Sequence, residues 1–246
     1  GLAKRIEHIG LKKAVIGISG GLDSALALLV ADKAFDLLAL PKENIICITM
    51  PGFGTTKRTK SSAVTLTECI GAQLRDIDIV PACTQHMRDI GHDMSILDVT
   101  YENVQARERT QILMDTANKE GALLVGTGDL SELALGWCTY NADHMSMYGV
   151  NCSVPKTLVR YLVDFVADER GGKLGEVLRE ILATPVSPEL LPPDKNGKIA
   201  QKTEDTLGPY EVHDFFLYHF QRFGASPDKL MFMACRAFDG VYSREQ

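Results

Sequence analysis

A Ser-Gly-Gly-Leu-Asp-Ser run at residues 19–24 is the first part of the sequence whose residue types suit the binding of an anion. It follows the apolar run 14–18 directly and leads into a helix-like pattern. Glycines let backbone N–H groups approach an anion closely, and a helix start adds unpaired N–H donors and the positive end of the helix dipole. The two serines add hydroxyl donors. We therefore predict that this run, the phosphate loop, binds phosphate groups.

Asp23 lies inside the phosphate loop, although a carboxylate by itself repels phosphate. Its presence is explained if a divalent cation lies between the carboxylate and the phosphates. The alternative is that the acidic or hydroxyl side chain only caps the following helix. The complete run, placed directly after an apolar strand, favours phosphate binding. It is neither a Walker loop, because no Gly-Lys-Ser/Thr follows, nor a Gly-x-Gly-x-x-Gly dinucleotide fingerprint.

A second polar motif, Gly-Thr-Gly-Asp-Leu-Ser-Glu, occupies residues 126–132 after the apolar run 122–125. One interpretation is a strand-to-helix turn in which Asp129 or Ser131 caps the helix. The other places Glu132 one helical turn into a pocket, where it is a second carboxylate near Asp23 for Mg²⁺. The motif alone leaves both interpretations open.

The elements that must position these motifs alternate along the chain. Strands are predicted at 14–18, 44–50, 73–80 and 122–125, and helices at 25–38, 59–70, 81–91 and 101–120. This alternation predicts an α/β fold with a parallel sheet and helices on both faces. Such sheets bind ligands beyond the carboxyl ends of their strands. We therefore expect the strand ends after Ile18, Met50 and Val125 to share one pocket.

The strand signals stop at about residue 140. Helices are predicted at 155–169, 174–182, 210–223 and 228–238. Residues 184–197 contain four prolines and end in Asp-Lys-Asn-Gly, which excludes regular structure there. Long irregular loops inside a compact chain are commonly functional. Our hypothesis is that this loop closes over the reactants as a lid.

The overall composition limits the class of protein. A net charge of −6 indicates no general affinity for nucleic acid or an anionic membrane. No run has the length of a membrane span, and the first residues lack the plan of a signal peptide. The six cysteines form neither a Cys-x-x-Cys pair nor a zinc-finger spacing. We therefore predict reduced thiols in a cytoplasmic protein.

The phosphate loop resembles the PP-loop of ATP pyrophosphatases, which cleave ATP between the α- and β-phosphates. That superfamily includes synthetases of GMP, asparagine, argininosuccinate and NAD. The stretch Leu-Ala-Leu-Gly-Trp-Cys-Thr-Tyr-Asn-Ala-Asp-His-Met-Ser-Met-Tyr at 133–148 resembles the segment that follows the Gly-Thr-x-x-x-x-Glu motif of NAD synthetases, in the glutamine-dependent form. Further segments similar to that branch are 50–54, 101–109, 154–157, 201–205 and 207–210.

The resemblance implies that nicotinic acid adenine dinucleotide and ATP bind together with Mg²⁺. The nicotinate carboxylate then attacks the α-phosphorus, and ammonia converts the acyl-adenylate to NAD and AMP. The implied catalytic residues are Asp23 and Lys156, and the implied metal ligands are Asp23 and Glu132. The implied ATP-binding residues are Ser19, Gly20, Gly21, Asp23, Ser24, Met50, Thr127, Lys156 and Ser187. The implied dinucleotide-binding residues are Asn103, Arg107, Thr127, Glu132, Trp137, Asp143 and Lys202. The family also implies a homo-oligomer, at least a dimer.

Two arginines on the predicted helix 101–120 are weighed separately. Residues two apart on a helix point to different faces, so Arg107 and Arg109 are expected to have different roles. The family's Asn-x-x-x-Arg pattern favours Arg107 as a dinucleotide contact, with Asn103 on the same face, and leaves Arg109 open. Asp143 corresponds to an acidic position near the nicotinate, with capping of the next turn as its alternative.

Glutamine-dependent members of the family carry an amino-terminal, nitrilase-like glutaminase domain, and nothing similar precedes the first predicted strand. We therefore expect residues 1–246 to be the NAD synthetase domain of a longer protein, with the glutaminase domain absent. This piece is expected to use free ammonia and not glutamine. Two alternatives are a tRNA-modifying PP-loop enzyme, which needs a cysteine pair and a basic surface, and a non-catalytic module that senses adenine nucleotides.

Overall fold

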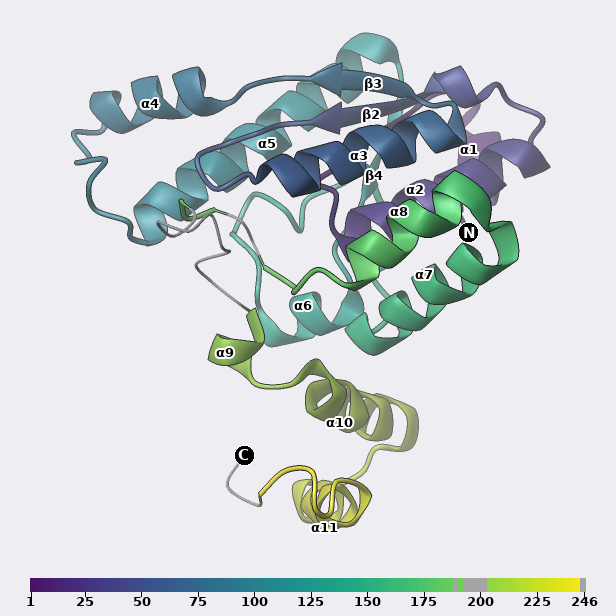
Figure 1. Ribbon diagram of the computed structural model, residues 1–246, viewed down its shortest axis with the longest axis vertical. Coiled ribbons are helices and arrows are strands. Elements are labelled where there is room, and N and C mark those ends of the chain that lie inside the picture. Colours follow the sequence, from purple (N-terminus) through teal and green to yellow (C-terminus); the bar gives the residue numbers. More distant parts are fainter. Residues whose placement is uncertain (188–189, 193–202, 244–246) are drawn as a thin grey trace.

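The computed structural model describes residues 1–187, 190–192 and 203–243. Its centre is a five-stranded parallel sheet with the order β3-β2-β1-β4-β5 (Figure 1). The strands are β1 (Ala14–Gly17), β2 (Ile45–Thr49), β3 (Gln73–Asp76), β4 (Leu123–Gly126) and β5 (Tyr148–Gly149). The chain adds β2 and β3 on one side of β1, and β4 and β5 on the other. Such a reversal of strand order is where α/β sheets bind their ligands.

Successive residues of the central strands face opposite sides of the sheet, as strand geometry requires. In β1, Ala14 and Ile16 belong to one hydrophobic cluster and Val15 to the other. The first cluster includes residues of α1 (Leu2–Ile9), α2 (Leu22–Leu37), α3 (Lys57–Ile70), α7 (Lys156–Arg170) and α8 (Gly172–Leu182). The second includes residues of α4 (Val80–Asp89) and α5 (Val99–Glu120). The predicted α/β fold with helices on both faces is confirmed.

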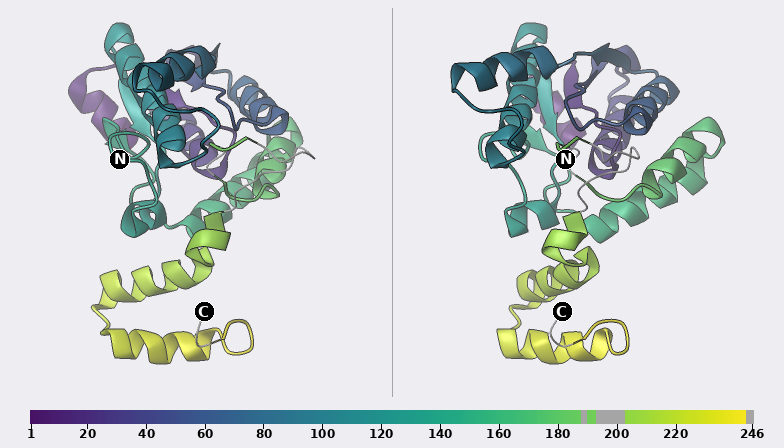
Figure 2. Two further views of the ribbon diagram at one scale, coloured as in Figure 1. Left: turned by 90° about the vertical axis from the view of Figure 1, so that its left-hand side faces the viewer. Right: turned by 60° about the vertical axis from the view of Figure 1, so that its left-hand side comes forward.

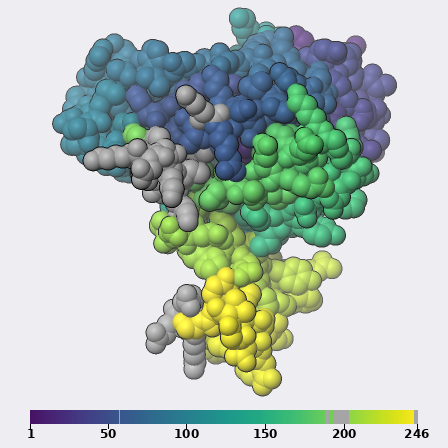
Figure 3. Space-filling model, in the orientation of Figure 1, coloured from purple at the N-terminus to yellow at the C-terminus, as the bar shows by residue number. Residues whose placement is uncertain are grey.

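The C-terminal helices extend away from the sheet. The remaining elements are the 3₁₀ turn η1 (Lys42–Asn44), α6 (Leu130–Leu135), α9 (Thr203–Leu207), α10 (Tyr210–Phe223) and α11 (Pro227–Ala237). Figure 2 shows α10 and α11 as a hairpin beyond the body of the molecule, and Figure 3 shows this part as narrower than the body. Helix α10 contacts α6 and α7 of the body.

The bounds of some elements differ from the sequence prediction. The strand predicted for 73–80 ends at Asp76, because the Asp78 carboxylate accepts a hydrogen bond from the Val80 N–H (2.9 Å) where α4 begins. The two-residue β5 was not predicted, because two residues show no alternation. Helix α2 begins at Leu22, so its first turn lies inside the predicted phosphate loop.

The six cysteines are all free thiols, as predicted. Burial raises the pKa of the Cys47 thiol to about 12, which leaves it protonated and unreactive at neutral pH. Among the described residues, no helix combines the length and the apolar composition needed to cross a bilayer.

Candidate active site

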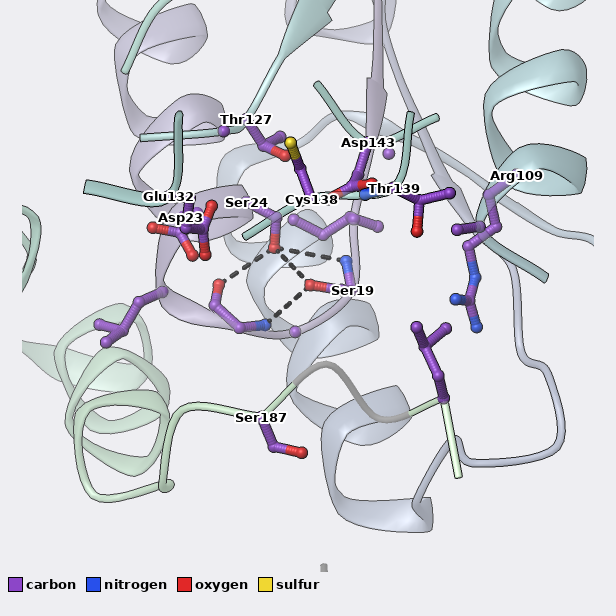
Figure 4. A pocket seen from close by; sticks show the side chains of 18 of the residues that line it. Ser19, Asp23, Ser24, Arg109, Thr127, Glu132, Cys138, Thr139, Asp143 and Ser187 are labelled. Atoms are coloured by element: carbon purple, nitrogen blue, oxygen red, sulfur yellow. Dashed lines mark hydrogen bonds between the residues drawn. The ribbon is translucent and has the colours of Figure 1, made fainter. Parts of the chain in front are cut away.

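A pocket of about 550 Å³ lies beyond the carboxyl ends of β1, β2 and β4, where the strand order reverses. Its wall includes Ile18, Met50 and Val125, so the predicted shared pocket is confirmed. The predicted site residues that line it are Ser19, Gly20, Gly21, Asp23, Ser24, Met50, Thr127, Glu132, Trp137, Asp143 and Ser187. Figure 4 shows Asp23 beside Glu132 on one side of the phosphate loop and Arg109 on the other.

The phosphate loop is held in shape by its own hydrogen bonds (Figure 4). The Ser19 and Ser24 hydroxyls lie 3.1 Å apart, Gly21 N–H donates to Ser19 Oγ (3.2 Å), and Ser24 Oγ donates to the Gly21 carbonyl (3.0 Å). Gly20 has a φ of +85°, and a Cβ there would lie 2.2 Å from the Thr59 carbonyl oxygen. Only glycine fits this turn. No side chain caps the start of α2, which suits a helix end that receives an anion.

Lys156, the first residue of α7, is surrounded by three carboxylates. Its Nζ lies 2.7 Å from Asp23 Oδ2, 2.8 Å from Asp129 Oδ2 and 2.7 Å from Glu132 Oε1. The lysine side chain is 1% exposed, and that of Asp129 is fully buried. We call these four residues the Lys156 cluster. One ammonium balances three carboxylates, so the cluster carries excess negative charge when all four groups are ionised.

Burial dominates the titration of the Lys156 cluster. It raises the pKa of Asp23, and repulsion from Glu132 raises it further. Burial also raises the pKa of Asp129 to about 6, and that of Glu132 above its ordinary value. Burial by itself would lower the pKa of Lys156, but the charges of its three partners raise it, so the lysine stays protonated.

The chemistry of the Lys156 cluster fits a divalent cation. Asp23, Asp129 and Glu132 place carboxylate oxygens within 4.8 Å of one another. Among the described residues, the buried Asp23 Oδ1 has no hydrogen-bond partner. Asp129 Oδ2 lies close to the lysine but has hydrogen-bond geometry to no donor in the described part of the chain. Carboxylate oxygens are the ligands that Mg²⁺ prefers. The structure therefore brings the predicted pair Asp23 and Glu132 together and adds Asp129 as a third candidate ligand.

The structure confirms the capping interpretation of the 126–132 motif and places Glu132 in the pocket near Asp23, while its binding of Mg²⁺ stays a prediction. The Asp129 side chain caps α6 by accepting a hydrogen bond from Glu132 N–H (2.8 Å) through Oδ1. Its other oxygen faces Lys156, and Glu132 lines the pocket. Capping and pocket formation are compatible because the two oxygens of one carboxylate have different partners.

Asn151 is a site residue that sequence reasoning missed. It is fully buried, and its Nδ2 donates to the carbonyls of Asp23 and Thr127, each at 2.9 Å. It thereby ties the phosphate loop to the 126–132 motif across the strand reversal. A lone asparagine in a loop gives no sequence signal for this role.

A model of the NAD synthase family matches residues 1–232. The chain belongs to the NAD synthase family. A glutamine-dependent NAD(+) synthetase from Mycobacterium tuberculosis is 43% identical over 246 residues, covering 97% of this chain and 36% of that protein. One from Thermotoga maritima is 32% identical over 244 residues, covering 97% of this chain and 39% of that protein. The chain thus spans between 36% and 39% of the length of these two relatives.

Solved structures share the fold of this NAD synthase chain. A glutamine-dependent NAD(+) synthetase from Cytophaga hutchinsonii has a TM-score of 0.76 at 19% identity, covering 100% of this chain and 44% of that one. An NMN synthetase from Francisella tularensis has a TM-score of 0.69 at 22% identity, covering 98% of this chain and 92% of that one. At these identities the likeness concerns the fold.

In the NAD synthase chain, the Arg107 and Arg109 side chains leave different faces of α5, as predicted. Arg109 lines the pocket, and its Nε donates to the Met50 carbonyl (3.2 Å). Arg107 is exposed and donates to the Tyr140 carbonyl (3.2 Å), outside the lining of the pocket. Asn103, also outside that lining, accepts from the Thr139 hydroxyl (2.8 Å). The dinucleotide role of Asn103 and Arg107 stays a prediction.

Asp143 bonds to the turn that precedes it, and not to the next turn as the capping alternative predicted. Its carboxylate accepts a hydrogen bond from Thr139 N–H (2.8 Å), which organises the turn, and the residue also lines the pocket. Burial raises the pKa of this carboxyl. A role beside the nicotinate therefore stays a prediction.

The segment after α8 forms part of the pocket wall, through Thr184, Pro185, Val186, Ser187 and Leu190. Thr203 N–H donates to the Val186 carbonyl (3.1 Å), and Gln105 Nε2 donates to the Leu190 carbonyl (2.9 Å). The described part of the predicted loop thus borders the pocket, while closure as a lid stays a hypothesis. Lys202 lies outside the described residues.

Proposed function

We propose that the chain catalyses the ATP-dependent amidation of nicotinic acid adenine dinucleotide to NAD, with ammonia as nitrogen donor. The observation that carries this proposal is the Lys156 cluster beside the phosphate loop, in a pocket of a chain of the NAD synthase family. Such a site can bind a triphosphate and balance the charge of its leaving group.

The reaction has two steps. A nicotinate carboxylate oxygen forms a bond to the α-phosphorus of ATP, and the bond from that phosphorus to the bridging oxygen of pyrophosphate breaks. Ammonia then forms a bond to the acyl carbon, AMP leaves with its oxygen, and a proton is released. Neither step needs a covalent protein nucleophile, so the residues act by positioning and by electrostatics.

The phosphate loop supplies the donors for ATP. The Ser19 and Ser24 hydroxyls and the N–H groups at the start of α2 line the pocket and bind phosphate oxygens. Met50 and Thr127, at neighbouring strand ends, border the nucleotide, and Ser187 borders it from the segment after α8.

Asp23 and Glu132 would hold Mg²⁺, with Asp129 available as a third ligand. The cation supplies neutralisation of the phosphate charge and orientation of the triphosphate. Lys156 is 1% exposed and lies behind the carboxylates, which supports a role in holding them together. A direct contact between Lys156 and the pyrophosphate, as predicted, requires the ammonium to bind a phosphate oxygen as well as the carboxylates.

The dinucleotide is assigned to the other side of the pocket. Trp137 and Asp143 line the pocket, and Arg109 adds a cation on the side away from Asp23 and Glu132. Asn103, Arg107 and Lys202 complete the predicted set, which fits a long substrate that extends beyond the pocket. We also propose a homodimer and a cytoplasmic location, and a glutaminase domain in a longer protein that delivers ammonia from glutamine.

Product analysis tests the proposal. The chain is mixed with ATP, Mg²⁺, ammonium chloride and nicotinic acid adenine dinucleotide, and NAD, AMP and pyrophosphate are measured. We expect equimolar NAD and pyrophosphate, no product when glutamine replaces ammonia, and loss of turnover with EDTA. A nucleotide-sensing module would bind ATP without releasing pyrophosphate, and a tRNA-modifying enzyme would turn over ATP only with tRNA. Preference for nicotinic acid mononucleotide would assign the shorter substrate instead.

A further inference from the structure

Helix α10 reaches the Lys156 cluster from the C-terminal hairpin through Asp214. This carboxylate is 6% exposed. Its Oδ2 accepts a hydrogen bond from Thr157 N–H (2.8 Å), and its Oδ1 accepts one from the Ser131 hydroxyl. Ser131 Oγ in turn accepts from Lys156 N–H (2.9 Å). One side chain of α10 is therefore bonded to α6 and, directly and through Ser131, to the first two residues of α7.

These bonds replace a cap that α7 lacks. Its N-cap residue is Pro155, which has no side-chain acceptor, and no cap hydrogen bond is formed there. Buried N–H groups of a first helical turn need partners. Asp214 and Ser131 provide them, and the negative charge lies where the helix dipole favours it. The position of the Lys156 backbone therefore depends on a residue 58 positions later in the chain.

The first residue of α10 also contacts the ammonium end of Lys156. Nζ lies 5.4 Å from the centre of the Tyr210 ring, and Tyr210 is 3% exposed. A cation over an aromatic face is attracted by the ring. Tyr210 and Asp214 lie one turn apart, so the same face of α10 contacts both ends of the lysine.

We propose that Asp214 is a positioning residue, which caps α7 from α10 and thereby places the Lys156 ammonium among Asp23, Asp129 and Glu132. The C-terminal hairpin then contributes to the active site, although none of its described residues lines the pocket. Its kinetic consequence rests on the proposed function, whereas its structural consequence does not.

The test compares Asp214→Ala, which loses both hydrogen bonds, with Asp214→Asn, which keeps the shape. The amide oxygen of the asparagine can accept from Thr157 N–H, and its NH₂ can donate to Ser131 Oγ in place of the hydrogen bond that the Ser131 hydroxyl donates in the wild type. Asp228→Ala, which removes an exposed carboxylate in the first turn of α11, is the control. Labelling of lysine amines, read by mass spectrometry, reports the access of reagent to Lys156, with Lys42 as internal reference. Steady-state kinetics give kcat and KM for ATP.

In Asp214→Ala we expect the ratio of Lys156 to Lys42 labelling to rise at least about tenfold. We expect kcat to fall about ten- to a hundredfold, as when an outer-shell partner of a site residue is lost, with KM for ATP within about threefold. In Asp214→Asn we expect both the labelling ratio and kcat to lie close to the wild-type values. Asp228→Ala should match the wild type in both.

A wild-type labelling ratio in Asp214→Ala overturns the proposal, as does a normal kcat with raised labelling. If Asp214→Ala does not fold, Ser131→Ala takes its place with the same expectations, because it removes the acceptor of Lys156 N–H and the hydroxyl that donates to Asp214. If the wild-type chain makes no NAD, the proposed function fails, and the labelling ratio still decides the role of Asp214.

Discussion

Two clusters of lysine and carboxylate side chains lie at different ends of β1. Where β1 begins, Glu120 binds Lys13 (2.9 Å) and Arg75 (2.8 Å), and these side chains are between 18% and 41% exposed. Beyond the end of β1, the buried Lys156 is shared by three carboxylates. In the first cluster one carboxylate forms ion pairs with two cations, and in the second one cation forms ion pairs with three carboxylates.

The carboxyl pKa values of the two clusters shift in opposite directions. Hydrogen bonds from Lys13 and Arg75 lower the pKa of Glu120 to about 2. Burial raises the pKa of Asp23, Asp129 and Glu132. Folding therefore favours the charge of Glu120 and disfavours the charges around Lys156. Three disfavoured charges kept together support the proposal that these carboxylates bind a cation.

The largest expected effect is that of Lys156→Met. Removing one partner of a buried ion pair costs about 3–5 kcal/mol, and we expect the free energy of unfolding to fall by about that amount. NAD formation should fall at least about a hundredfold, since each 1.36 kcal/mol of lost transition-state stabilisation is tenfold. Urea unfolding and product analysis measure the two effects. Lys13→Met is the control at the exposed cluster, and we expect only small changes in the free energy of unfolding and in NAD formation. Equal effects of the two variants would remove the distinction between the clusters.

Asp23→Asn should separate activity from stability. We expect NAD formation at saturating Mg²⁺ to fall about a hundredfold, because a ligand of the cation is lost. The free energy of unfolding should stay constant or rise, because a disfavoured charge is removed. The matched control is Asp32→Asn, a buried carboxylate bonded to Lys42 and to Arg170 (3.2 Å). That variant should destabilise the protein and leave turnover intact. An Asp23 variant as unstable as the Asp32 variant would contradict our interpretation of the Lys156 cluster.

The smallest effect is expected for Glu120→Gln, which should leave NAD formation unchanged. The pKa of Glu120 is lower in the folded than in the unfolded state, so its charge stabilises the fold above the unfolded pKa. This stabilisation is lost as pH falls from the ordinary glutamate pKa of about 4.5 toward about 2. The difference in urea midpoint between wild type and Glu120→Gln should therefore be constant near neutrality and shrink below about pH 4.5. A difference that is constant down to pH 3 would contradict the pKa assigned to Glu120.

Local pattern sufficed for the positions of the phosphate loop and of Glu132. The loop follows β1 and the 126–132 motif follows β4, and the carboxyl ends of neighbouring parallel strands meet at one edge of the sheet. Asp129 was recognised only as a possible cap. Spacing along a helix start predicts which N–H a carboxylate accepts, but not what its second oxygen faces.

The choice between Arg107 and Arg109 shows the limit of a linear pattern. Helical periodicity separates the two side chains correctly, but it carries no information about which face of α5 borders the pocket. That is decided by how α5 packs on β1 and β4, and it places Arg109 in the pocket wall.

The sequence by itself determined the α/β architecture, the pocket at the reversal of strand order, and the pairing of Asp23 with Glu132, because each follows from short-range patterns and the geometry of a parallel sheet. Only the tertiary structure decided that Lys156 is buried behind the carboxylates, and that Asn151 and Asp214 hold its surroundings together. Those contacts join residues between 24 and 133 positions apart. They depend on the packing of whole helices, which no local periodicity encodes.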